Sequence, residues 1–252
     1  MTHMNLPGTT WSTPAATSAP LEVHLLGQVD FESALFLQER LVYEISGRED
    51  RQGALLLCEH PPLVTVGREG SRAHLRAEPR DLATRLMTVR WLNRGGGCLV
   101  HAPGQLAAYP IVPLDRLGLG LADYRQRLEE ALIDLAREQQ VEAFRRADEP
   151  GAWTRSGQFA HVGVAVKSWV AYHGVYVNVN PAPELLRLVW SNRGCERVTS
   201  LTAARGRVVS MNSVREALVR HLVRRLGYER FHVYSGHPLL RRTRQHVYAG
   251  AS

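Results

Sequence analysis

Hydrophobic residues recur at helical spacing in three stretches of the chain. The first begins after Asp30, which is placed as an N-cap, the second covers about residues 121–140, and the third opens at Ser213. Ser213 and Glu216 have the spacing of a capping box, so we expect the last helix to start there. The predicted buried faces are Phe31, Ala34, Leu35, Leu41, Val42 and Ile45 in the first helix, Tyr124, Leu128, Leu132 and Leu135 in the second, and Val214, Leu218, Leu222 and Leu226 in the third.

Short apolar runs between these helices predict strands. Residues 54–58 form a continuous apolar run, typical of a buried strand, and residues 161–167 alternate with Val162, Val164 and Val166 on one face, as in a half-buried strand. Adjacent strands with helices set apart favour an α+β fold, with a mixed or antiparallel sheet and flanking helices on one face. Further strands are expected at residues 63–66, 88–92, 107–112 and 172–179, and residues 151–154 are expected to turn into the sheet.

A glycine-rich stretch between two of these strands is the first candidate for a functional site. Gly95, Gly96 and Gly97 follow Arg94, and the apolar segment after them ends in His101. Glycine permits positive φ and lets another group approach the main chain closely, so such turns line ligand sites. The alternative is a hairpin connector that binds nothing. Arg94 and His101 at the two ends favour a site.

Composition limits the classes of protein that the chain can belong to. Its 252 residues suit one large or two small domains, and the apolar content is that of an ordinary globular protein. The sequence has no apolar run of about 18 residues and no N-terminus that resembles a signal peptide, so we expect a cytoplasmic protein. We expect residues 1–20 to be a disordered tail, residues 21–234 to be one domain and residues 235–252 to be a basic tail.

Charge and cysteine content narrow the range of partners. The formal net charge is +7, and the 31 basic residues include a single lysine, Lys167. This excess favours an acidic partner, but the arginines are scattered and no nucleic-acid-binding motif occurs. The three cysteines, Cys58, Cys98 and Cys195, include no CxxC pair, which argues against a disulfide framework or a zinc site.

Several motifs occur together in one order along the chain. They are Glu-His-Pro-Pro at 59–62, Thr-Val-Gly-Arg at 65–68, Arg-Gly-Gly at 94–96, His-x-Pro-Gly-Gln at 101–105, Tyr-Pro-Ile at 109–111, Gly-x-Trp at 151–153, Val-Gly-Val at 162–164, His-Gly at 173–174 followed by Asn178, and Val-Thr-Ser-Leu at 198–201. Through these motifs, over about residues 24–230, the chain resembles the LipB-type octanoyltransferases. That family is related in fold to biotin and lipoate protein ligases, so the resemblance implies the same catalytic-domain fold.

The resemblance also implies an activity and its partners. Enzymes of the family take an octanoyl group from acyl carrier protein onto a cysteine, as a thioester. They pass it to a lysine of a lipoyl domain in a 2-oxoacid dehydrogenase or of the glycine cleavage H protein. A thiolate suits this step because it is both a strong nucleophile and a good leaving group, and a nearby lysine lowers its pKa and moves the proton. We expect no metal or other cofactor, no nucleic acid and no membrane among the partners.

Both catalytic positions of the family carry other residues in this chain. Counting back five residues from Gly163 places Gln158 at the lysine position, and counting back eight from Thr199 places Ser191 at the cysteine position. Leu99 stands where the family has a threonine. Glutamine carries no proton at neutral pH, and a serine hydroxyl needs a positioned base. The acyl-binding residues that the resemblance implies are Arg94, Gly95, Gly96, Gly97, Cys98, Leu99, Val100, His101, His161, Val162, Gly163, Gly174, Val175 and Tyr176.

Other side chains could replace the missing pair. Cys195, four residues after Ser191, is a possible substitute nucleophile, and Cys98 is a weaker candidate. Lys167 is nine residues from position 158, about 30 Å along a strand at roughly 3.3 Å per residue. The odd spacing also predicts that Lys167 points to the opposite face of the strand.

Histidines offer a second route to catalysis. His101, His161 or His173 could act as a general base toward Ser191 and give an acyl-serine enzyme. We expect at least two of the three to be structural histidines with satisfied hydrogen bonds.

Three functions remain open at this point. The first is an octanoyl-family acyltransferase that acts through Ser191 or Cys195, or that holds the carrier thioester against the target lysine for direct attack. The second is a catalytically silent relative that binds an octanoyl or lipoyl group, or the lipoyl domain, in a regulatory or scaffold role. The third, an ATP-dependent ligase of the related fold, is the weakest, because such ligases also depend on a lysine at this strand.

Overall fold

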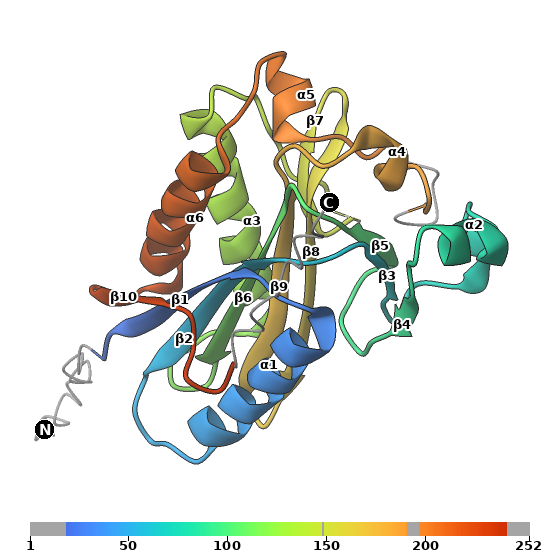
Figure 1. The fold of residues 1–252 in the computed structure, drawn as a ribbon. Helices are drawn as coiled ribbons and strands as arrows, with labels where there is room; N and C mark the ends of the chain where they lie inside the picture. The colour runs from blue at the N-terminus through green and yellow to red at the C-terminus, as the bar shows by residue number, and fades with distance from the viewer. Residues whose placement is uncertain (1–18, 148, 191–196, 241–252) are drawn as a thin grey trace, which may run out of the picture.

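The structure, a computed structural model, describes residues 19–147, 149–190 and 197–240. Its main element is a seven-stranded mixed sheet (Figure 1). In spatial order the strands are β10 (Phe231–Ser235), β1 (Leu21–Gln28), β2 (Gly53–Glu59), β6 (Gln105–Pro113), β9 (Val170–Asn178), β8 (Gly157–Lys167) and β7 (Gly151–Thr154). β1 is parallel to β2 and β10, whereas the remaining pairs are antiparallel, which confirms the expected α+β fold with a mixed sheet.

A second, three-stranded sheet stands beside the first (Figure 1). Its central strand is β3 (Leu63–Val66), which pairs in parallel with β4 (Val89–Trp91) and antiparallel with β5 (Cys98–His101). A 3-10 turn (Arg72–His74) and the short helix α2 (Pro79–Thr84) lie between β3 and β4, and Leu82 of α2 packs into the core of this sheet. Two more short helices, α4 (Pro183–Leu186) and α5 (Leu201–Arg205), follow β9.

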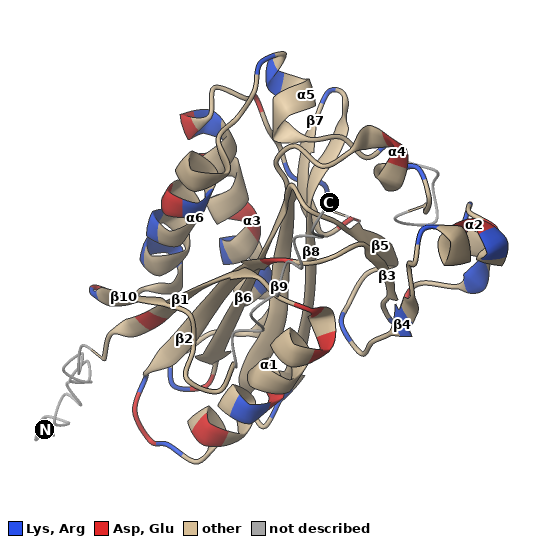
Figure 2. Cartoon of the chain, viewed as in Figure 1, with Lys and Arg blue, Asp and Glu red and all other residues tan. Residues whose placement is uncertain are grey.

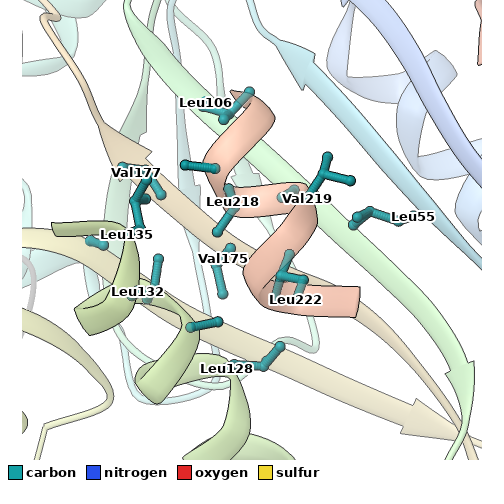
Figure 3. Close-up of a cluster of buried hydrophobic side chains, with 14 of the residues drawn as sticks. Leu55, Leu106, Leu128, Leu132, Leu135, Val175, Val177, Leu218, Val219 and Leu222 are labelled. Atoms are coloured by element: carbon teal, nitrogen blue, oxygen red, sulfur yellow. The ribbon is translucent and has the colours of Figure 1, made fainter. Parts of the chain in front are cut away.

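Three long helices cover the large sheet, and they lie on both of its faces. α3 (Leu121–Glu138) and α6 (Met211–Leu226) pack on one face, where Leu128, Leu132, Leu218 and Leu222 meet the strands (Figure 3). α1 (Phe31–Ser46) packs on the other face. The prediction that helices cover one face is therefore wrong.

The apolar run of β2 explains why both faces need cover. Leu55 and Leu57 join the core under α3 and α6, whereas Ala54, Leu56 and Cys58 join the core under α1. Alternate residues of a strand point to opposite faces, so a continuous apolar run must be buried on both sides.

The last helix begins earlier than the sequence predicts. Ser210 is its N-cap residue and Met211 its first residue, so Ser213 lies inside the first turn. The Ser213 hydroxyl instead accepts a hydrogen bond from Gln139 Nε2 at 3.1 Å, a contact between α6 and the end of α3. The predicted capping box is wrong, because the helix begins before Ser213 and the Ser213 hydroxyl bonds to Gln139 instead of capping it. Asp30, in contrast, is confirmed as the N-cap of α1, since its carboxylate accepts from Ser33 N at 2.9 Å.

β8 is also not the half-buried strand that its alternation predicts. Residues 158–163 are all buried, because α3 covers one face and the loop between β4 and β5 covers the other. Toward the far end of β8 the pattern is reversed, since Ala165 is buried and Val166 is 38% exposed. Residues 151–154, expected to turn into the sheet, form the edge strand β7 itself.

The described chain continues past β10 along the end of β1. Gly236 N donates to Leu25 O at 2.7 Å, and Leu240 packs against the core under α1. Over the described ranges, no helix is long and apolar enough to cross a membrane.

Candidate active site

The glycine stretch packs its backbone directly against β8. Gly95 N donates to Val164 O at 2.9 Å. A Cβ on Gly96, whose φ is +80°, would lie 2.4 Å from His161 Nε2, and a Cβ on Gly163 would lie 2.8 Å from Gly95 O. Real Cβ atoms do not approach other atoms so closely, so glycine is required on both sides of this contact. The expected close approach is therefore to another strand of the same chain.

Arg94 fixes this turn to the small sheet from inside. Its guanidinium is fully buried and donates from Nη2 to Thr65 O at 3.1 Å and to Thr65 Oγ1 at 2.8 Å. Nη1 donates to Gly95 O at 3.0 Å, whereas Nε has no hydrogen-bond partner among the described residues. The guanidinium carbon lies 5.9 Å from the ring centroid of Tyr176. Burial lowers the pKa of Arg94, and the side chain remains a cation enclosed by main-chain and hydroxyl oxygens.

His60 and His101 form a buried ring cluster beside Arg94. His60 Nδ1 lies 2.8 Å from Val29 O, which can only accept, so Nδ1 carries the proton and Nε2 accepts from the Tyr109 hydroxyl at 2.7 Å. His101 Nε2 lies 2.9 Å from Thr65 Oγ1. Burial lowers the pKa of His60 to about 4 and that of His101 well below its usual range, so both rings are neutral at pH 7.

His161 and His173 are buried without hydrogen-bond partners for their rings among the described residues. Burial, with Arg94 as the second cause, lowers the pKa of each to about 3. His173 adopts a positive φ of +56°, and its main-chain N donates to Gln38 Oε1 at 2.9 Å. Of the three candidate histidines only His101 has a ring hydrogen bond, so the expectation that two of them are satisfied structurally is wrong within the described chain.

Gln158 occupies the position that the sequence matches to the family's lysine. The side chain is 2% exposed, and its Nε2 donates to Pro150 O at 3.0 Å. Its main-chain N donates to Arg197 O at 2.8 Å, and its main-chain O accepts from Thr199 N at 2.9 Å. β8 is thus joined at this residue to the segment that follows Ser191 and Cys195, and those two residues lie outside the described ranges.

A bulge in β8 determines which side chains share a face with Gln158. Gly151 of β7 pairs with His161, and Trp153, two residues further along β7, pairs with Gln158. Paired residues point to the same side and residues two apart share a face, so Gln158 and His161 lie on one face of the sheet. From His161 to Lys167 the register is regular, so Lys167 also shares that face, at the far end of the strand. The predicted opposite orientation of Lys167 is wrong because the spacing rule does not include the bulge.

The structure gathers some of the expected acyl-binding residues and separates others. Arg94, Gly95, Gly96, Gly97, His101, His161, Gly163 and Tyr176 surround the turn and the ring cluster. Leu99 joins the core under α1, and a Cβ on Gly174 would lie 2.3 Å from Ala108 O of β6. Four residues lie elsewhere: Cys98 and Val100 in the core of the small sheet, and Val162 and Val175 in the core under α3 and α6.

Polar residues outside the expected set hold the site together. Gln105 Nε2 donates to Val100 O at 2.8 Å and to Asn178 Oδ1 at 2.9 Å, and Asn178 Nδ2 donates to Thr199 O at 3.1 Å. Glu69 Oε1 accepts from Gly96 N at 3.1 Å. Gln105, Asn178 and Thr199 each belong to one of the sequence motifs, so the motifs are the signal that could have identified them as one hydrogen-bonded chain.

The two described cysteines are not thiolates. Cys58 and Cys98 are both buried, and burial raises the pKa of each thiol. Cys98 Sγ donates to Ser71 O at 3.6 Å and lies in the small-sheet core. A thiol of raised pKa and without access is a poor nucleophile, so neither cysteine replaces the family's.

Comparison with known proteins agrees with this architecture. Residues 30–223 match the model of the lipoyl protein ligase A/B catalytic domain. An octanoyltransferase from Geobacter metallireducens is 38% identical over 195 residues, 77% of this chain and 87% of that protein, and one from Syntrophotalea carbinolica is 36% identical over 80% and 92%. Lipoate-protein ligase A bound with ATP has a TM-score of 0.71 at 15% identity, over 88% of this chain and 91% of that one. A bipartite lipoate protein ligase from Thermoplasma acidophilum has a TM-score of 0.67 at 15% identity, over 88% and 89%.

The solved structures are too distant in sequence to show more than a shared fold. The family model covers most of the described domain, and the octanoyltransferases align over most of their own length. These matches confirm the resemblance that the motifs carry. The chain belongs to the family of lipoyl protein ligase A/B catalytic domains.

Proposed function

We propose that this protein transfers an octanoyl group from acyl carrier protein to a lysine of a lipoyl domain. The observation that carries the proposal is the buried turn, in which Arg94, Gly96, His101 and Gly163 make mutually dependent contacts. Full-length relatives that bear the name octanoyltransferase support the same acyl class. A lipoyl domain of a 2-oxoacid dehydrogenase or the glycine cleavage H protein is the proposed acceptor, and the reaction belongs to lipoate biosynthesis in the cytoplasm.

Direct transfer is the simplest route for a chain that has Gln158 and Ser191 at the two catalytic positions. A thioester is already activated, and holding it against an amine contributes several kcal/mol through orientation alone, up to about 7–11 kcal/mol in the best cases. A covalent route through Ser191 or Cys195 remains part of the proposal. It needs a base near the hydroxyl or thiol, because neither is ionised enough at neutral pH without one.

The surface charge supports a protein partner that is acidic. Lys and Arg outnumber Asp and Glu, 31 to 24. Figure 2 shows residues of both charges interspersed along α3 and α6, while the strands of the large sheet carry few charged residues. The family resemblance implies acyl carrier protein as the octanoyl donor. That protein is acidic, so the excess of basic residues on this chain would attract it. An interspersed pattern also differs from the continuous basic stripe that nucleic acid requires.

One observation favours a second function, a catalytically silent binder. The Gln158 amide, at the family's lysine position, is tied to Pro150 O and cannot carry a proton. A protein that kept the turn and lost proton transfer would bind an octanoyl or lipoyl group, or the lipoyl domain, in a regulatory or scaffold role.

Intact mass spectrometry separates these functions. The protein is incubated with octanoyl carrier protein, then with a lipoyl domain, and the same is done with Ser191→Ala and Cys195→Ala. Octanoylated lipoyl domain with no adduct on the protein indicates direct transfer, and an adduct that one substitution abolishes identifies a nucleophile. If no lipoyl domain is modified while octanoyl ligand still binds, the transferase proposal fails and the silent binder stands.

A further inference from the structure

His161 is the next side chain beyond Gln158 on the same face of the sheet. The bulge in β8 brings it there, and its partner across the strand pair, Gly151, has no side chain to separate the two. A Cβ on Gly151 would lie 2.6 Å from Gln158 Nε2, so the Gln158 amide lies over the gap that this glycine leaves. The imidazole of His161 is thus the neighbour, along β8 and on the same face, of the position that the family's lysine occupies.

The ring of His161 is directed at the glycine turn. Its Nε2 and Cε1 would lie 2.4 and 2.6 Å from a Cβ on Gly96, and Nε2 would lie 3.4 Å from a Cβ on Gly163. The side chain is 3% exposed, yet neither ring nitrogen has a hydrogen-bond partner in the described part of the chain. A buried polar group without a partner costs about 1–3 kcal/mol, so the ring needs a partner from outside the described residues, and a bound ligand would supply one.

We propose that His161 is the catalytic residue that moves the proton in this chain, in the place that lysine takes in the family. The proposal rests on the octanoyl transfer proposed above. His173, the other unpartnered histidine, stacks on Tyr172 with ring centroids 4.8 Å apart and belongs to β9. His101 has its Nε2 occupied by Thr65 Oγ1. Of the three rings, His161 alone faces the glycine turn from the strand of Gln158.

The step balances without any further reactant. The lipoyl-domain amine attacks the thioester carbonyl carbon and a C–N bond forms, while Nε2 of His161 accepts the proton that the attacking nitrogen loses. Nε2 then donates this proton to the carrier sulfur as the C–S bond breaks. The products are the amide and the free carrier thiol, and His161 is neutral again. If an enzyme hydroxyl or thiol attacks first, the same nitrogen accepts and returns one proton in each half-reaction.

One cation and several neutral groups surround the ring of His161. Arg94 faces the ring with a positive charge, His101 and Tyr176 face it as neutral groups, and Glu69 lies across the turn on the Gly96 N–H. Burial and Arg94 lower the pKa of His161 to about 3, and burial raises the pKa of Tyr176 to about 12. The imidazole is therefore unprotonated at neutral pH, and Arg94 opposes its protonation, so the ring can hold the proton only briefly.

The test measures octanoyl transfer to a lipoyl domain under multiple turnover with the full chain. His161→Gln is expected to lower kcat about 100-fold, as for loss of a general base, and to leave KM within about twofold. Adding Gln158→Lys is expected to raise kcat at least about tenfold above that of His161→Gln alone, because the lysine then supplies the proton transfer. A packing role for His161 would not be restored from position 158. His232→Gln, at an exposed residue of β10, is the matched control, with unchanged rates.

The outcomes distinguish a failure of octanoyl transfer from a failure of the role of His161. No product from the unsubstituted chain contradicts octanoyl transfer and overturns the role of His161 with it. Product at equal rates from the unsubstituted chain and from His161→Gln overturns the role of His161 alone, as does a loss that appears in His173→Gln instead. Thermal melting confirms that each variant is folded, and His161→Asn replaces His161→Gln if the latter is not.

Discussion

At the scale of residues, four buried histidines make the stability of the fold depend on pH. Burial lowers the pKa of His60 to about 4 and of His161 and His173 to about 3, and holds that of His101 well below its usual range. In the unfolded chain each takes up a proton near pH 6.5, whereas the folded chain does not. The unfolded state therefore binds more protons as the pH falls, and it is favoured.

We predict full stability above about pH 6.5 and a steep loss between pH 6.5 and about 4. Each histidine contributes a slope of about 1.4 kcal/mol per pH unit in that window. Urea unfolding at pH 7.5 and 5.0 measures the effect, and His173→Gln should make the dependence shallower by the share of one histidine. Equal free energies of unfolding at the two pH values would contradict neutral buried rings.

Gly96 sets a second expectation at this scale. Gly96→Ala would place a methyl group 2.4 Å from His161 Nε2 at a φ of +80°. Gly206, the C-cap residue of α5, has a similar φ of +73° but open space around the position of a Cβ. Gly206→Ala thus carries only the backbone cost, about 1–2 kcal/mol, and Gly96→Ala should cost clearly more. Denaturant midpoints of the two variants make the comparison, and equal midpoints would argue against the packing of the turn on His161.

At the scale of elements, Glu129 of α3 anchors the edge strand that pairs with His161. Its buried carboxylate accepts from Gly151 N at 3.2 Å, from Arg125 Nε at 3.0 Å and from Arg145 Nε at 2.8 Å. Glu129→Gln should cost about 1.5–3 kcal/mol, because it removes the charge from a buried carboxylate that accepts hydrogen bonds from two partly exposed arginines. Glu142→Gln is the control, since Glu142 and its partner Arg155 are both exposed and a surface pair contributes little. Thermal melting is the measurement, and equal shifts for both variants would refute the anchor.

The sequence predicts the elements whose hydrophobic pattern is regular, and it fails where tertiary contact decides. The long helices follow from helical spacing, and so do the buried faces of α3 and α6. On α1 the predicted Leu35 is only half-buried, whereas Leu37 and Gln38, which the spacing did not predict, are buried. The prediction contained neither β1 nor β10. All residues of β10 are exposed, and β10 forms a strand only by pairing with β1. The six-residue helix α2 buries only Leu82, too little for a periodic signal.

In the candidate site, too, the sequence predicts some features, and tertiary contact decides the others. The motifs correctly place Arg94, Gly96 and Gly163 together, because their close packing allows few other residues. They do not show that Val162 and Val175 point to the opposite core, which depends on strand register, nor that one bulge turns Gln158 toward His161. Register and bulges arise from pairing between distant strands, so local spacing does not contain them.

At the scale of the molecule, the candidate site lies where the two sheets meet. Gly95 N reaches Val164 O of the large sheet, and Arg94 reaches Thr65 of the small one. A ligand that fills this junction stabilises the folded state by mass action, about 2.7 kcal/mol at a hundredfold excess over its Kd. An octanoyl ligand should therefore raise the Tm of the unsubstituted protein, and decanediol or another unrelated amphiphile at the same concentration should not. No shift with octanoyl carrier protein would argue against acyl binding at the junction.

The measurement that tests the central claim most directly is the intact mass of a lipoyl domain after incubation with octanoyl carrier protein and the unsubstituted chain. We predict a domain that gains the mass of one octanoyl group, at a rate proportional to the concentration of this protein. A domain whose mass is unchanged, while a known octanoyltransferase modifies it in the same mixture, would contradict octanoyl transfer by this chain.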